Sequence, residues 1–213
     1  MEKSGEPLRV AVLASGSGSN LQAIIDRCAD GSIAATVVLV MSNNRNAFAL
    51  ERATKAGIRA IHWSEKKAGS PEAFAEGLLE LMRAERVDLV VLAGYMKLVP
   101  KPVVDTYKGR MLNIHPALLP KYGGKGFYGI HVHEAVLAAG DTESGATVHL
   151  VDPEYDRGPI ILQERVPVKP GDTPETLRDR VLELEHRLLP EAIAMMAALF
   201  REGKLRKESV NDS

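Results

Sequence analysis

The sequence contains a single cysteine, Cys28, among its 213 residues. An intramolecular disulfide is therefore impossible, and a zinc site built from several thiolates is excluded. No apolar run approaches the roughly 20 residues that a membrane-spanning helix needs, and residues 1–7 lack the basic and apolar regions of a signal peptide. We therefore expect a cytoplasmic protein that does not bind a membrane.

An excess of charge of one sign is also missing. The 27 basic and 28 acidic side chains give a formal net charge of −1, and a small basic cluster lies only in the tail after Phe200. A nucleic-acid-binding domain usually carries a basic excess, because much of its affinity comes from pairing phosphates with lysine and arginine. The balance argues against a nucleic-acid partner. The length and the ordinary globular composition suit one domain spanning residues 1–213.

Apolar runs alternate with helical patterns through the first half of the chain. Strands are expected at residues 8–14, 34–41, 58–62 and 87–93, and helices from Asn20, at 47–56 and from Pro71. Asn20 is expected to cap the first of these helices, and Gly57 to end the second in a left-handed conformation. Fully apolar strands separated by helices indicate a parallel sheet covered on both faces. Residues 8–110 are therefore predicted to form a Rossmann-like, phosphate- or nucleotide-binding half.

From Met111 onward the pattern changes. Strands are expected at 111–114, 146–151 and 159–168, and helices near 133–139 and from 173 to about 200. A tight acidic turn is expected to join the last two strands, which would be antiparallel or form a mixed edge. Thr173 should cap the final helix with Pro174 at its first position, and Pro190 should kink or break it. The predicted fold class is α/β, with a mostly parallel Rossmann-like sheet, flanking helices, antiparallel or mixed C-terminal strands and a long C-terminal helix.

A run of small residues follows the first strand, and it consists of Gly16, Ser17, Gly18, Ser19 and Asn20. Backbone N–H groups and the positive end of a helix dipole favour an anion there, and glycines let a phosphate approach closely. We prefer phosphate binding to the alternative, a tight turn that only lets strand and helix pack. The dinucleotide fingerprint is incomplete, because Leu21 replaces its third glycine and no acid ends the second strand. A phosphate monoester therefore fits better than NAD.

Asn113 and His115 lie two residues apart on a predicted strand, so they share one of its faces. An amide donor and an imidazole at the carboxyl end of a sheet can stabilise an oxyanion and move a proton, as acyl transfer requires. Asp156 lies in the acidic turn downstream, and a carboxylate near His115 would raise the imidazole pKa and keep it protonated near neutral pH. The alternatives are a strand-end histidine and a solvated acidic turn.

Possible metal ligands are grouped in the sequence at His131, His133, His149 and Asp152. They form neither an H-E-x-x-H pattern nor an acceptable four-ligand spacing, so no metal site is predicted. Glu185 flanks the apolar stripe of the last helix. It either faces a cleft, where it would bind a cationic or amine group, or is a surface acid paired with Arg178, Arg187 or another base.

Four segments occur in an order and spacing that are typical of one family: residues 15–20, 93–96 and 112–120, and 147–149 followed by Asp156. Together they resemble the phosphoribosylglycinamide formyltransferase family over the chain from Arg9 to about Leu205. The resemblance implies an enzyme of purine biosynthesis that transfers the formyl group of 10-formyltetrahydrofolate to the amine of glycinamide ribonucleotide. The two small molecules would be its partners, and no metal is implied.

The resemblance also implies roles for individual residues. Asn113, His115 and Asp156 would be catalytic, and residues 111–205 would form the catalytic and folate-binding half. Gly18, Ser19 and Asn20 would hold the ribonucleotide phosphate within the loop of residues 16–20, and Glu185 would contact the glycinamide. The folate would be bound, largely through backbone groups, by Met96, Lys97, Leu98, Val99, Asn113, Val151, Asp152 and Asp156.

Three features depart from the family pattern. Lys97 stands where relatives often carry arginine. Lysine keeps the positive charge but lacks the planar, forked guanidinium that could bind the acidic tail of the folate. Leu182 replaces a basic residue of some relatives, so phosphate binding would depend more on the glycine loop. Residues 122–130 are longer than the usual family version and contain four glycines. This segment is interpreted either as a mobile flap or as a contact between the subunits of a homodimer.

Three other functions remain as alternatives. A formyltetrahydrofolate hydrolase would share the asparagine, histidine and aspartate, but it needs no phosphate loop and usually carries an N-terminal regulatory domain, whereas this chain begins at the first strand. A methionyl-tRNA formyltransferase would need a further C-terminal domain with a basic surface. A non-catalytic nucleotide-binding module would use only the first strand-helix-strand unit.

Overall fold

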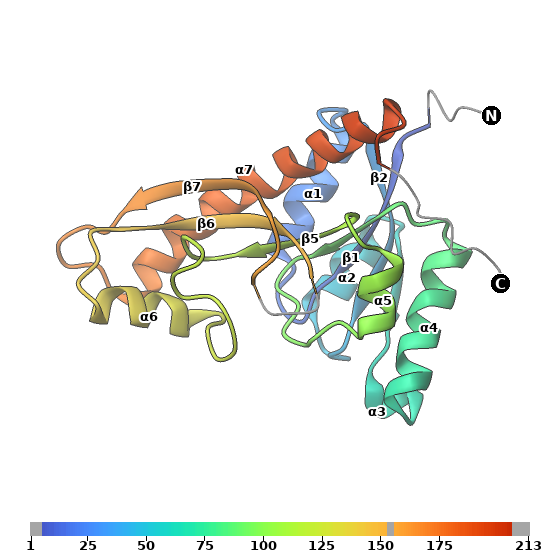
Figure 1. Ribbon diagram of the computed structural model, residues 1–213, viewed down its shortest axis with the longest axis horizontal. Coiled ribbons are helices and arrows are strands. Elements are labelled where there is room, and N and C mark those ends of the chain that lie inside the picture. The colour runs from blue at the N-terminus through green and yellow to red at the C-terminus, as the bar shows by residue number, and fades with distance from the viewer. Residues whose placement is uncertain (1–5, 153–155, 206–213) are drawn as a thin grey trace.

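The computed structural model describes residues 6–152 and 156–205 and is built around a seven-stranded sheet with the order β3-β2-β1-β4-β5-β6-β7 (Figure 1). The parallel strands are β1 (Leu8–Leu13), β2 (Ala35–Ser42), β3 (Arg59–His62), β4 (Leu89–Leu92) and β5 (Met111–His115). Then β6 (Glu143–Leu150) runs antiparallel to β5, and β7 (Ile160–Pro167) antiparallel to β6. The predicted fold class is confirmed, including the antiparallel end of the sheet.

Helices cover both faces of this sheet (Figure 1). They are α1 (Ser19–Ala29), α2 (Phe48–Lys55), α3 (Glu65–Ala68), α4 (Pro71–Ala84), α5 (Lys101–Thr106), α6 (Ile130–Ala138) and α7 (Pro174–Arg201). Side chains alternate along β1, so that Val10 and Val12 join a core with α1 and α7, while Ala11 and Leu13 join a second core with α4 and α5. This double burial explains why the parallel strands are apolar throughout.

The last helix begins as its sequence predicts. Thr173 accepts a hydrogen bond from the backbone N–H of Thr176, whose hydroxyl accepts one from the Thr173 N–H in return, and Pro174 occupies the first helical position. Pro190 is buried inside the helix, which continues to Arg201. Of the kink or break predicted at Pro190, the break is therefore wrong, and α7 packs as one element against α1, α6, β6 and β7.

Two other local predictions have different outcomes. Gly57 ends α2 with a φ of 70°, as predicted. Asn20 does not cap α1, because Gly18 is the N-cap residue with a φ of 70° and the helix begins at Ser19. The first turn of α1 therefore includes Asn20 and directs its side chain into the protein interior.

The connection between β6 and β7 comprises residues 151–159, one residue more at each end than the predicted strand bounds left for the turn. Residues 153–155, which include one of the three predicted acids of this turn, lie outside the described residues, as does the tail from residue 206. In the part of the chain that the structure describes, no helix has the length and apolar character to cross a membrane.

Candidate active site

A cavity of about 670 Å³ opens where the parallel strands β1, β4 and β5 end. Its lining comes from the glycine loop after β1, the segment after β4, the end of β5, the β6–β7 connection and one face of α7. Ligands of open α/β sheets bind at this edge, because the loops that follow the strands converge there. All of the residues predicted to bind substrate or folate line this cavity.

The glycine loop is held in a defined shape. A Cβ atom on Gly18 would lie 2.7 Å from the Cα atom of Ala49, so only glycine fits between the loop and α2. The Ser15 hydroxyl accepts a hydrogen bond from the Met96 N–H at 2.8 Å and donates to the Asn43 side chain at 2.5 Å. The loop is thus attached to the segment after β4, which forms the neighbouring wall of the cavity.

Glu185 lies inside the molecule beside this loop. Its side chain accepts a hydrogen bond of 2.6 Å from Asn20, and only 7% of the residue is exposed. Burial raises the pKa of the Glu185 carboxyl from 4.5 to about 7, against the lowering effect of the hydrogen bond. The alternative of a surface acid is wrong, since Arg178 pairs with Asp179 and Arg187 with Glu164.

The three residues predicted to react are brought together across the sheet. The Asn113 amide nitrogen lies 3.2 Å from one carboxylate oxygen of Asp156, and the Nδ1 atom of His115 lies 3.7 Å from the other. Two backbone groups of the glycine-rich segment join them, because His115 Nε2 donates to the Tyr122 carbonyl at 2.6 Å and the Gly124 N–H donates to Asp156 at 2.9 Å. An amide, an imidazole and a carboxylate therefore share one wall of the cavity.

The net pKa shift of His115 differs from the sequence-based prediction. Burial lowers the pKa of the His115 imidazole, and the opposing effect of the Asp156 charge is smaller. Asp156 therefore acts on the pKa of His115 in the predicted direction, but the net shift is downward, opposite to the prediction. Burial by itself would raise the pKa of Asp156, but the contact with the His149 side chain, the charge of His115 and the Gly124 N–H lower it below its usual value. Burial of His115 and its pairing with Asp156 therefore act in opposite directions on the pKa of the imidazole.

The residues predicted to bind folate form another wall. Met96 and Leu98 are about half exposed, at 51% and 52%, although both are large and apolar, and Lys97 is exposed between them. Val151 and Asp152 line the cavity from the β6–β7 connection. Exposed apolar side chains around a cavity provide a surface for a flat, largely apolar ligand.

Two contributions to the site were not predicted. His149 lies opposite Asn113 in the β5–β6 pair, with its Nε2 atom 3.0 Å from the Asn113 amide nitrogen. The segment 147–149 carried part of the family resemblance, but no role followed from it. The Tyr122 carbonyl is a backbone group, for which a sequence gives no signal. Among residues 6–152 and 156–205, no group of three potential ligands is arranged to hold a metal ion.

Comparison with known proteins identifies the family. A family model described as formyl transferase matches residues 8–193. The phosphoribosylglycinamide formyltransferase of Escherichia coli is 43% identical over 199 residues, which cover 93% of this chain and 90% of that protein. The chain belongs to the formyl transferase family, and within it to the phosphoribosylglycinamide formyltransferases.

A solved structure and a longer relative agree with this placement. The glycinamide ribonucleotide transformylase 1 of Symbiobacterium toebii superposes with a TM-score of 0.85 and 47% identity, covering 93% of this chain and 90% of that one. The trifunctional purine biosynthetic protein adenosine-3 of Drosophila pseudoobscura pseudoobscura is 46% identical over 208 residues. That match covers 96% of this chain, but only 15% of the longer protein.

Proposed function

We propose that this chain transfers the formyl group of 10-formyltetrahydrofolate to the amine of glycinamide ribonucleotide, a step of purine biosynthesis. The observation that carries the proposal is the convergence of Asn113, His115 and Asp156 on one wall of a cavity that also contains the glycine loop. Family membership supports the same reaction. The chemistry needs no metal and no covalent enzyme intermediate.

The two substrates would enter from opposite ends of the cavity. The phosphate of the ribonucleotide binds the glycine loop, where the N–H groups of the first turn of α1 favour an anion. Glu185 then contacts the glycinamide end, and a cationic amine beside it would favour the ionised carboxylate. The folate ring lies against residues 96–99 and the β6–β7 connection, which places its formyl group next to Asn113.

The neutral amine of the glycinamide attacks the formyl carbon and produces a tetrahedral adduct with negative charge on the former carbonyl oxygen. An Asn113 N–H stabilises this oxygen, and so does the Nε2–H of His115, which donates to the Tyr122 carbonyl in the ligand-free protein. As the negative charge grows, it raises the pKa of His115, so the imidazole takes up a proton from water and returns it to water when the adduct collapses and the charge on the oxygen disappears.

Asp156 completes the proton transfer. Its carboxylate lies on the Nδ1 side of His115, where it stabilises the imidazolium, and it accepts the proton that the attacking nitrogen must lose. The proton then passes, directly or through water, to the departing folate nitrogen when the bond from that nitrogen to the formyl carbon breaks. The products are the formylated ribonucleotide and tetrahydrofolate, so atoms and charges balance.

The direct test is to incubate the purified protein with 10-formyltetrahydrofolate and glycinamide ribonucleotide and to follow the formylated ribonucleotide by mass spectrometry. Formate without formylated ribonucleotide would indicate the hydrolase instead, and bound ligand without any product would indicate a binding module. Asn113→Ala and His115→Ala should each lower kcat by about 10²- to 10³-fold, the usual effect of removing one oxyanion donor. His131→Ala is a matched control, because His131 is exposed and lies outside the cavity lining.

A further inference from the structure

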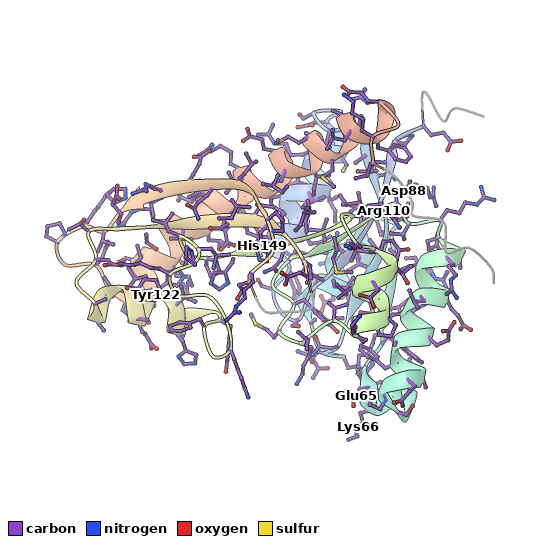
Figure 2. The ribbon with its side chains drawn as sticks, in the orientation of Figure 1. Glu65, Lys66, Asp88, Arg110, Tyr122 and His149 are labelled. Atoms are coloured by element: carbon purple, nitrogen blue, oxygen red, sulfur yellow. The ribbon has the colours of Figure 1, made fainter. Side chains whose placement is uncertain are left out.

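His149 is the second-last residue of β6 and lies beside β5 in the sheet (Figure 2), where 2% of the residue is exposed. Its register partner on β5 is Asn113. The Nδ1 atom is 2.9 Å from the carbonyl oxygen of Leu150, and the Nε2 atom is 3.0 Å from the amide nitrogen of Asn113. The Nε2 atom also lies 3.5 Å from a carboxylate oxygen of Asp156, farther than from Asn113. Both ring nitrogens of this buried histidine therefore have a partner, and two residues of the proposed reacting group lie against Nε2.

The partners determine where the imidazole proton lies. A carbonyl oxygen only accepts hydrogen bonds, so the Nδ1 atom of His149 must carry the hydrogen that reaches Leu150. In a neutral imidazole the Nε2 atom is then an acceptor. This assignment matches the contact with Asn113, whose NH₂ group is a donor.

The orientation of the Asn113 amide follows from a second contact. A carboxylate only accepts hydrogen bonds, and one Asp156 oxygen lies 3.2 Å from the same Asn113 nitrogen. Turning the amide over would place its oxygen against this carboxylate oxygen, and two acceptors would then face each other. The two hydrogens of the amide therefore point in different directions, one to His149 and one to Asp156.

From this geometry, and resting on the proposed function, we infer that His149 is a positioning residue that orients Asn113 for oxyanion stabilisation. His149 holds one amide hydrogen permanently and thereby fixes the plane of the side chain. The second hydrogen, which points to Asp156 in the ligand-free protein, is the one that the formyl oxygen takes up. Without the acceptor on His149, only the contact with Asp156 orients the amide, and the plane of the side chain is no longer fixed when the formyl oxygen takes up that second hydrogen.

Two substitutions separate this role from simple packing. His149→Leu removes the hydrogen-bond acceptor and fills the same buried place in the sheet with an apolar side chain. His149→Gln instead supplies an amide oxygen that can accept a hydrogen bond from Asn113. We expect His149→Leu to lower kcat by about 10²-fold, the effect of a small misplacement of a reacting group, with little change in KM for either substrate. His149→Gln should recover a large part of this loss. Equal loss of kcat in both variants, or a loss confined to KM, would overturn the inference.

The tautomer of His149 provides a test that does not depend on activity. Imidazole ¹⁵N chemical shifts of the ligand-free wild-type protein distinguish the two ring nitrogens, and the His149→Gln variant assigns the signals. A protonated Nδ1 and an unprotonated Nε2 at neutral pH are expected. A protonated Nε2 would show that His149 cannot accept from Asn113, and the inference would fail. If wild-type protein forms no formylated ribonucleotide while the tautomer is as expected, the failure belongs to the proposed function alone.

Discussion

The buried carboxyl of Glu185 should make the free energy of unfolding decrease as the pH rises. The pKa of Glu185 is about 7 in the folded chain, compared with an ordinary value of 4.5. Between these two values the folded state binds the proton more strongly than the unfolded chain, so unfolding releases it and raising the pH favours the unfolded state. The contribution of the neutral acid is complete below pH 4.5, and it is lost as the pH rises to 7.

The size of this effect follows from the shift. One pKa unit corresponds to about 1.4 kcal/mol, so a shift from 4.5 to about 7 corresponds to about 3 kcal/mol over the whole window. Glutamine has the shape of the neutral acid and still offers an oxygen to the Asn20 amide. Glu185→Gln should therefore be about as stable as wild type at the acidic end of the window and about 3 kcal/mol more stable at its upper end.

Urea unfolding, followed by helical circular dichroism across this window in the ligand-free protein, measures the difference between wild type and Glu185→Gln. All other titrating groups are shared, so they cancel in the difference. Glu183→Gln is a matched control, because Glu183 is an exposed acid on the same helix. A difference between wild type and Glu185→Gln that stays constant within about 0.5 kcal/mol, the usual effect of a surface substitution, would refute the reasoning. The stabilised variant should also bind glycinamide ribonucleotide more weakly, since the carboxylate that contacts the glycinamide is gone.

Three further substitutions test the walls of the site and the sheet that carries it. Gly18→Ala places a residue with a side chain in a left-handed backbone conformation, which costs about 1–2 kcal/mol, and its Cβ atom would clash with Ala49. Steady-state kinetics should show a raised KM for the ribonucleotide. Ser15→Ala removes two hydrogen bonds, one to the Asn43 side chain and one from the Met96 N–H. Only the second holds the wall proposed for the folate, so KM for the formyl donor should rise about 2- to 10-fold, as expected for that one hydrogen bond. Gly145→Ala would place a Cβ atom against the backbone of β7 and should lower the free energy of unfolding by about 1–3 kcal/mol or more. Thermal unfolding would detect this loss. An unchanged Tm would contradict the close approach of Gly145 to β7.

Local sequence signals located most of the fold. Thr173 and Pro174 predicted the start of α7, and Gly57 predicted the end of α2, because capping depends on neighbouring residues alone. The helices α3 and α5 were missed, since they have only four and six residues and so cannot show helical periodicity.

The parts of the site that escaped prediction depend on contacts between distant residues. Asn20 has the chemistry of a cap, but the left-handed Gly18 begins the helix earlier, and the Asn20 side chain then meets Glu185, 165 residues away in the sequence. His149 acquires its place only through the register of β6 against β5. Likewise, the charged partner of His115 was predicted correctly, but its pKa also depends on burial, which the completed packing determines.

The central claim is that the Asp156 carboxylate, together with Asn113 and His115, carries formyl transfer. The most direct measurement is the single-turnover rate of formyl transfer by Asp156→Asn. Asp156 has a φ of 55°, a conformation that asparagine adopts readily, so the variant should keep the backbone while it loses the charge and the proton acceptor. We predict a decrease of about 10²-fold or more, comparable with the loss of an electrostatic group at a reacting centre, with ribonucleotide binding unchanged. A rate within a few-fold of wild type would contradict the account.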